Sequence, residues 1–116
     1  MGLGARTPEE LDALIEDAFV VRDRRAVAAL FESEALLVDG AAREARGARE
    51  IAGWATESWG RGLTYLGAPP RVLQAGDTAL VLTPQGIGVA RRCDDRTWRY
   101  AIALLATEHR RTKEER

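Results

Sequence analysis

Several residue types are missing from this chain or occur only once. Its 116 residues include no asparagine and a single cysteine, histidine and lysine, which are Cys93, His109 and Lys113. Without asparagine there is no acceptor for N-linked glycosylation, and a lone cysteine cannot form an intrachain disulfide. We therefore expect a reducing, cytoplasmic location. One histidine and one cysteine cannot supply a zinc site, so we predict no metal.

Long apolar runs and a strong net charge are missing as well. No segment approaches the roughly 20 apolar residues that span a bilayer, and residues 1–8 lack the pattern of a signal peptide. The formal net charge is −1, so no basic field attracts nucleic acid or an anionic membrane. The segment Gly86-Ile87-Gly88 begins a predicted strand that no helix follows, which is not a dinucleotide fingerprint. We expect no cofactor, no nucleic-acid partner and no membrane partner.

The residues that are present fit one ordinary globular domain. The chain is 46% hydrophobic and 30% charged, and its length suits one domain with one core. We predict a single domain over residues 1–116, with a structured core at 8–107 and a charged tail at 108–116.

Three helices are predicted in the first half of the chain. The first begins with a cap, a first-turn proline and a capping-box glutamate: Thr7, Pro8 and Glu10. Its apolar face is formed at helical spacing by Leu11, Leu14, Ile15, Ala18 and Phe19. Away from that face we place the polar residues Asp12, Glu16 and Asp17. This helix ends near residue 22, Asp23 caps the second helix, and Gly47 opens the third. Gly53 inside the third helix costs roughly 1 kcal/mol relative to alanine, which indicates close packing there.

Seven segments carry strand patterns. The predicted strands are residues 35–39, 43–46, 63–66, 71–75, 78–82, 87–93 and 98–106. In the last of them one alternating face holds Trp98, Tyr100, Ile102 and Leu104. Helices followed by hairpin-linked strands indicate an α+β fold with a mostly antiparallel sheet. Such a sheet would curl strongly into a cone that the three helices close on one side.

The order of these elements resembles the NTF2-like superfamily, in particular its SnoaL-like and ketosteroid-isomerase-like members. The matching segments are residues 23–31, 35–40, 47–51, 76–81 and 94–99. The resemblance covers most of residues 8–107. It implies a cone-shaped fold with an internal cavity, and a homodimer that forms through the open face of the sheet.

Asp39 is the candidate catalytic residue. It ends a predicted strand, and the resemblance aligns it with the general base of the isomerase-like enzymes. A carboxylate in an apolar cavity has a raised pKa and can move a proton from carbon or water. The isomerases' first-helix tyrosine has no counterpart near Ile15, and segment 87–93 contains no carboxylate. Because the oxyanion partners are missing, we do not expect steroid-type isomerisation. The alternative is that Asp39 is a turn residue without a catalytic role.

The candidate ligand-binding residues are Phe19, Trp54, Tyr65 and Arg91. Aromatic side chains, among which we also count Trp59, can line a pocket or fill a core. Arg91 could point inward and pair with Asp39 or an acidic ligand, or it could point to solvent. Trp98 is expected to be a buried structural residue.

Two functions follow from these predictions. The first is a SnoaL-like pocket protein that binds a small, mostly apolar organic molecule, with Asp39 as general base of an isomerase, cyclase or hydrolase. The second is a non-catalytic ligand-binding or dimerisation module of the same fold. A cone filled by Phe19, Trp54 and Tyr65 would favour the second function, and an open cavity with Asp39 at its floor would favour the first.

Overall fold

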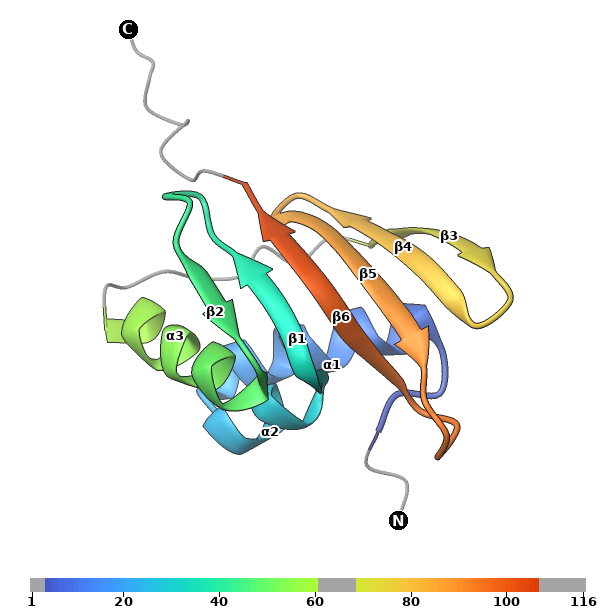
Figure 1. The fold of residues 1–116 in the computed structure, drawn as a ribbon, viewed down its shortest axis with the longest axis horizontal. Helices are drawn as coiled ribbons and strands as arrows, with labels where there is room; N and C mark the ends of the chain where they lie inside the picture. Colours follow the sequence, from blue (N-terminus) through green and yellow to red (C-terminus); the bar gives the residue numbers. More distant parts are fainter. Residues whose placement is uncertain (1–3, 61–68, 107–116) are drawn as a thin grey trace, which may run out of the picture.

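The computed structural model describes residues 4–60 and 69–106, which form a layer of helices on one face of a sheet. The helices are α1 (Pro8–Val21), α2 (Arg24–Ala29) and α3 (Ala48–Gly60). The strands are β1 (Phe31–Val38), β2 (Glu44–Arg46), β3 (Arg71–Ala75), β4 (Thr78–Thr83), β5 (Gly86–Arg92) and β6 (Trp98–Leu105). All three helices lie behind the sheet in Figure 1. The predicted α+β class is confirmed.

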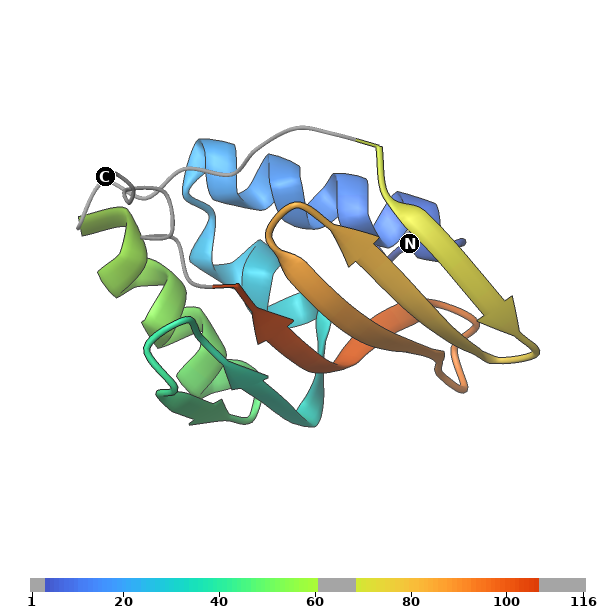
Figure 2. The same cartoon turned by 90° about the horizontal axis from the view of Figure 1, so that it is seen from above.

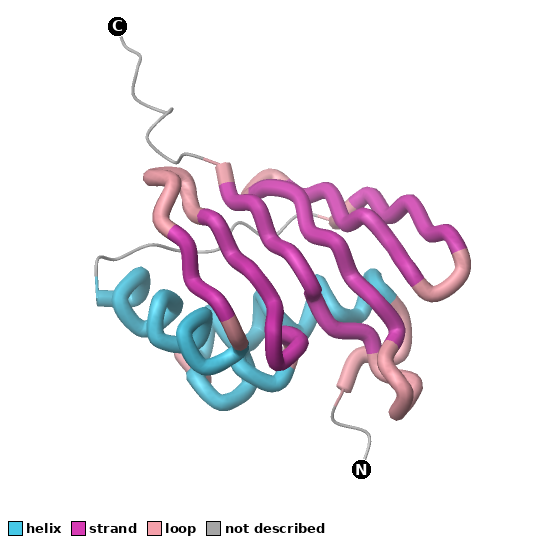
Figure 3. The backbone as a smooth tube through the Cα atoms, viewed as in Figure 1, coloured by secondary structure: helices cyan, strands magenta, loops and turns pink. Residues whose placement is uncertain are grey.

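The strands form one open sheet in the order β2-β1-β6-β5-β4-β3, which Figure 3 shows as a twisted wall. Four of the five neighbouring pairs are antiparallel, and β1 pairs with β6 in parallel. Seen from above, α1 runs across the sheet (Figure 2). The predicted strand at residues 63–66 lies outside the described residues.

Both predicted caps are present at the helix starts. The Thr7 side chain accepts a hydrogen bond of 3.0 Å from the backbone N–H of Glu10, and Asp23 accepts one of 3.1 Å from Ala26. Arg22 ends α1 in the left-handed conformation with φ 57°. Such caps satisfy backbone groups that the first and last helical turns leave without partners.

The sequence placed Asp12 on the solvent side of α1, and this prediction is wrong. Asp12 is only 2% exposed, and it lies within the buried stripe Pro8, Leu11, Asp12, Ile15 and Ala18. Asp12 lies four residues after Pro8 and three before Ile15, and this helical spacing places it on the same face as both. Burial, together with the charge of Asp12, raises the pKa of Tyr100 well above its ordinary range.

The predicted common face of β6 is also wrong. Trp98 and Tyr100 are buried against the helices, whereas Ile102 and Leu104 are 45% and 50% exposed on the opposite face. The pairing with β5 shifts between Val89 and Ala90, so one extra residue of β6 is left without a cross-strand partner. A bulge of this kind reverses the facing of every later side chain in the strand.

Tyr100 anchors the core between β1, β5 and β6. Its ring centroid lies 5.6 Å from that of Phe31, and its ring covers Gly88 so closely that a Cβ there would lie 2.4 Å from Cε1. Trp98 is buried, as predicted. No helix among the described residues has the length and apolar character needed to cross a membrane.

Candidate functional site

Asp39 lies directly after β1 at the start of the turn that leads into β2. Its Oδ1 accepts hydrogen bonds from the backbone N–H groups of Ala41 at 2.9 Å and Arg43 at 3.0 Å. The indole Nε1 of Trp54 donates to Oδ2 at 3.0 Å. The carboxylate therefore holds the β1–β2 turn and fixes the ring of Trp54 on α3.

These hydrogen bonds set the electrostatic state of Asp39. Burial alone would raise the pKa of its carboxyl, but the bonds from Trp54, Arg43 and Ala41 and the charge of Arg43 lower it below the ordinary range. The raised pKa expected for a carboxylate in an apolar cavity is not found, because three N–H donors stabilise the ionised form. Asp39 is accordingly ionised at neutral pH.

Two of the predicted binding residues meet between α1 and α3. The ring centroid of Phe19 lies 6.2 Å from that of Trp54 and 5.6 Å from that of Trp59. We call Phe19, Trp54 and Trp59 the aromatic cluster. Tyr65, the third predicted aromatic residue, lies outside the described residues.

Trp59 brings an uncommon feature to the aromatic cluster. It is 8% exposed, and its Nε1 is buried without a hydrogen-bond partner among the described residues. A buried donor without an acceptor costs about 1–3 kcal/mol. Sequence patterns identified Trp59 as an aromatic candidate, but they could not show that its N–H lacks an acceptor.

Arg91 does not approach Asp39. It is exposed on β5, and its Nε and an Nη donate to the two carboxylate oxygens of Glu32 at 3.0 and 2.6 Å. Glu32 stands near the start of β1, whereas Asp39 follows the end of that strand. The solvent-facing alternative for Arg91 therefore describes its position.

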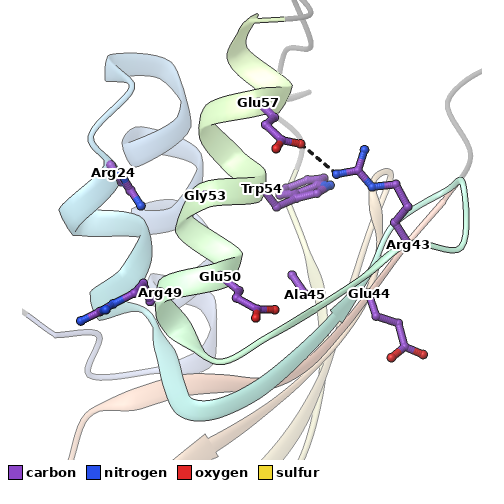
Figure 4. A pocket seen from close by; sticks show the side chains of 9 residues that line it. All are labelled: Arg24, Arg43, Glu44, Ala45, Arg49, Glu50, Gly53, Trp54 and Glu57. Carbon is purple, nitrogen blue, oxygen red and sulfur yellow. Dashed lines mark hydrogen bonds and ion pairs between the residues drawn. The ribbon is translucent and has the colours of Figure 1, made fainter.

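A charged groove of about 390 Å³ crosses the outside of α3, and Trp54 is the member of the aromatic cluster that lines it (Figure 4). Its lining residues are Arg24, Arg43, Glu44, Ala45, Arg49, Glu50, Gly53, Trp54 and Glu57. Arg43 closes one side of it with an ion pair of 2.8 Å to Glu57. Gly53 forms part of its floor, and a Cβ at this position would meet nothing within 4 Å. The close packing predicted at Gly53 is therefore wrong.

Comparisons with known proteins find likeness in structure alone. No family model matches the sequence, and no curated protein matches it. A ketosteroid isomerase-like protein from Erwinia carotovora atroseptica superposes with a TM-score of 0.72 at 20% identity, covering 86% of this chain and 92% of the other. An NTF2-like protein with a cystatin-like fold from Novosphingobium aromaticivorans superposes with a TM-score of 0.68 at 19% identity, covering 86% of this chain and 79% of the other. A Nostoc punctiforme protein of unknown function with a cystatin-like fold superposes with a TM-score of 0.71 at 16% identity, covering 85% of this chain and 86% of the other.

These likenesses identify the class of structure. The chain has the NTF2-like fold, with three helices on a curved, mostly antiparallel sheet that remains open. The predicted resemblance is confirmed at the level of fold. Because fold does not determine function, the activity has to be inferred from the site itself.

Proposed function

We propose that this chain is an NTF2-like binding domain for a small, mostly apolar organic molecule, and that it works as a homodimer. The observation that carries the binding proposal is the buried indole N–H of Trp59 in the aromatic cluster. Aromatic rings supply apolar contact area, and a few well-placed polar groups orient a ligand. A carbonyl or hydroxyl oxygen of the ligand would accept this N–H and remove the cost of leaving it without an acceptor.

A matched pair of probes tests this role of Trp59. 2-Acetylnaphthalene and 2-ethylnaphthalene have similar shapes, but only the first carries an acceptor oxygen. We expect the protein to bind the ketone about fivefold more tightly, which corresponds to one hydrogen bond of about 1 kcal/mol. Trp59→Phe should remove this preference and keep the naphthalene contact.

Trp98→Phe is the matched control, because Trp98 is buried on β6 outside the aromatic cluster. Binding is measured by calorimetry, and circular dichroism confirms that each variant is folded. The proposal fails if neither probe binds, or if the preference for the ketone survives Trp59→Phe.

Catalysis by Asp39 is a second candidate function, favoured by one contact. The Trp54 N–H fixes the orientation of Oδ2, and that oxygen can accept a second hydrogen bond. An oriented, ionised carboxylate could remove a proton from carbon next to a carbonyl group. Its lowered pKa makes it a weak base, and both of its oxygens already hold the turn and Trp54. We therefore place binding first.

Deuterium exchange tests the catalytic candidate directly. In D₂O a general base would take a proton from the acetyl methyl group of 2-acetylnaphthalene, form the enolate and return deuterium, which mass spectrometry detects. Exchange above the buffer rate that Asp39→Asn abolishes would support catalysis. Exchange at the buffer rate, or unchanged in Asp39→Asn, would exclude Asp39 as the base.

The homodimer proposal rests on the face of the sheet that the helices leave open. Residues directly opposite on neighbouring strands point to the same face. One such row, the first apolar row, crosses five strands through Leu73, Leu80, Val89, Ile102 and Leu36. A second apolar row runs through Leu82, Ile87, Leu104 and Val38. Five residues of these rows are 39–50% exposed: Leu73, Leu80, Ile87, Ile102 and Leu104. Large exposed apolar patches mark interaction sites, and two sheet faces pack about 10 Å apart.

Light scattering with one variant and one control tests the dimer. Ile102→Glu places a charge in the middle of the first apolar row, and we expect it to yield a monomer. Val21→Glu changes an equally apolar residue that is 70% exposed on α1, and it should leave the dimer intact. A parent protein that is monomeric at tens of micromolar would refute this part of the proposal.

A further inference from the structure

Resting on the proposed dimer, we infer that the second copy docks with β3 of each subunit over β2 of the other, so that Arg71 pairs with Glu44 of the partner subunit. The second apolar row carries the signal. Arg71 lies opposite Leu82 at its β3 end, and Glu44 lies opposite Val38 at its β2 end. The row therefore ends in a positive charge at one edge of the sheet and a negative charge at the other.

These two charges cannot meet within one chain. Five strand spacings of about 4.8 Å lie between the edges of the sheet, which is about 24 Å measured along it. Both residues are exposed, and among the described residues Arg71 takes part in no ion pair. Glu44 has only a loose contact of 3.5 Å with Arg46, which is itself exposed. Both charges are thus available to a partner.

Symmetry then selects between two arrangements. A two-fold axis parallel to the strands places each row over the same row of the partner subunit, with its two ends exchanged. Arg71 of one subunit then lies above Glu44 of the partner subunit. By symmetry this pair forms twice. An axis perpendicular to the strands puts β3 on β3 and leaves Arg71 far from the opposite charge. Two-fold interfaces are self-complementary, and a row with opposite charges at its ends is complementary to its own reversed copy.

The neighbouring charged residues limit the interface on one side. Arg91 and Arg99 continue the exposed face beyond the first apolar row, and they are paired with Glu32 and Asp95. Because these charges are already paired within the chain, they set no competing orientation. At the β2 edge, Arg46 lies opposite Leu36 and has only its loose 3.5 Å contact with Glu44. Arg71 and the loosely paired Glu44 at the ends of the second apolar row therefore decide how the second copy lies.

Charge reversal tests the arrangement. Arg71→Glu or Glu44→Arg alone replaces two attractions with two repulsions, and we expect the dimer dissociation constant to rise about tenfold or more. The double variant R71E/E44R restores opposite charges and should return the constant to within about threefold of the parent. Analytical ultracentrifugation at low salt measures all four proteins.

Two results would overturn this orientation and leave the proposed dimer intact. One is that each single variant dimerises with the parent's dissociation constant. The other is that the double variant dimerises more weakly than either single variant. A monomeric parent would instead refute the proposed dimer itself. Cross-linking gives an independent readout in a Cys93→Ser background. A short bismaleimide should join subunits of R71C/E44C but neither single variant, and cross-linking of R71C alone would show β3 on β3.

Discussion

The side chain of Asp39 performs three structural tasks at once. It binds two backbone N–H groups of the β1–β2 turn, and it holds the indole of Trp54. Local hydrogen bonding of this kind is a common use of aspartate in turns. A carboxylate with these partners is better suited to fixing the β1–β2 turn against α3 than to taking up a proton.

Replacing this carboxylate tests its structural role. In Asp39→Asn the amide oxygen can still accept from the turn, but the amide N–H₂ then faces the N–H of Trp54. We expect a loss of about 1–2 kcal/mol in the free energy of unfolding at pH 7, because a partly buried donor loses its acceptor. Urea denaturation measures it, and an unchanged midpoint would contradict the role.

The lowered pKa of Asp39 gives that difference a pH dependence. A carboxyl whose pKa is lower in the folded than in the unfolded chain contributes its full stability above pH about 4 and loses it as the pH falls through the folded value. Hydrogen bonds from the Thr97 hydroxyl and backbone N–H, and from Arg99, lower the pKa of Asp95 to about 2, so Asp95 titrates in the same window. Both proteins contain Asp95, so only the titration of Asp39 separates them. The difference in the free energy of unfolding between the parent and Asp39→Asn should become smaller below pH 4. A difference that stays constant would contradict the lowered pKa of Asp39.

Gly88 is the second residue whose role is fixed by one neighbour. A Cβ at this position would lie 2.4 Å from Cε1 and 2.8 Å from Cδ1 of the buried Tyr100 ring. Because the ring is packed between Phe31 and the sheet, it cannot move aside cheaply. We predict that Gly88→Ala lowers the free energy of unfolding by about 1–3 kcal/mol, as overpacked cores do. Chemical denaturation checks this, and a neutral result would mean that the ring is mobile.

At the scale of elements, α3 contains a glycine that packing does not require. A Cβ at Gly53 would meet nothing within 4 Å, so Gly53→Ala should add helix propensity without a clash. We predict a gain of about 0.5–1 kcal/mol in the free energy of unfolding, opposite in sign to Gly88→Ala. Thermal denaturation of both variants side by side makes each the control of the other. If Gly53→Ala were destabilised, the added Cβ would have to meet a neighbour that lies farther than 4 Å away in this structure.

The elements show how far sequence reasoning reaches. Caps at Thr7 and Asp23 and the strand pattern of residues 78–82 are local signals, and they predicted two helix starts and β4 closely. The prediction for β1 was less close, because that strand begins at Phe31 and not at residue 35. The facing of β6 was not predictable, because the bulge at Ala101 depends on its pairing with β5. The prediction that Asp12 faces solvent was wrong for a related reason, because only tertiary contacts accommodate a charged residue inside a buried stripe.

The same limit applies to the candidate site. The sequence indicated Phe19, Trp54 and Asp39, and the structure brings them together through the Phe19–Trp54 contact and the Trp54–Asp39 hydrogen bond. The position of Arg91 depends on Glu32, which is 59 residues away in the chain, so no local pattern could assign its partner. The buried N–H of Trp59 is likewise a tertiary property.

At the scale of the whole molecule, the two faces of the sheet differ in what covers them. The helix-covered face holds the core and, at one end, the aromatic cluster, and the open face carries the two apolar rows. A small domain with one apolar face exposed gains stability by covering it with an equal face. Ligand binding on one side and pairing on the other are thus compatible in a single chain.

The measurement that tests ligand binding most directly is the ¹⁵N-resolved NMR signal of the three indole N–H groups, those of Trp54, Trp59 and Trp98. On titration with 2-acetylnaphthalene we predict that one indole signal moves downfield, that Trp59→Phe removes this signal, and that 2-ethylnaphthalene does not shift it downfield. If the Trp59 indole signal is unmoved by the ketone, or moves equally with both probes, the proposed use of its N–H is contradicted.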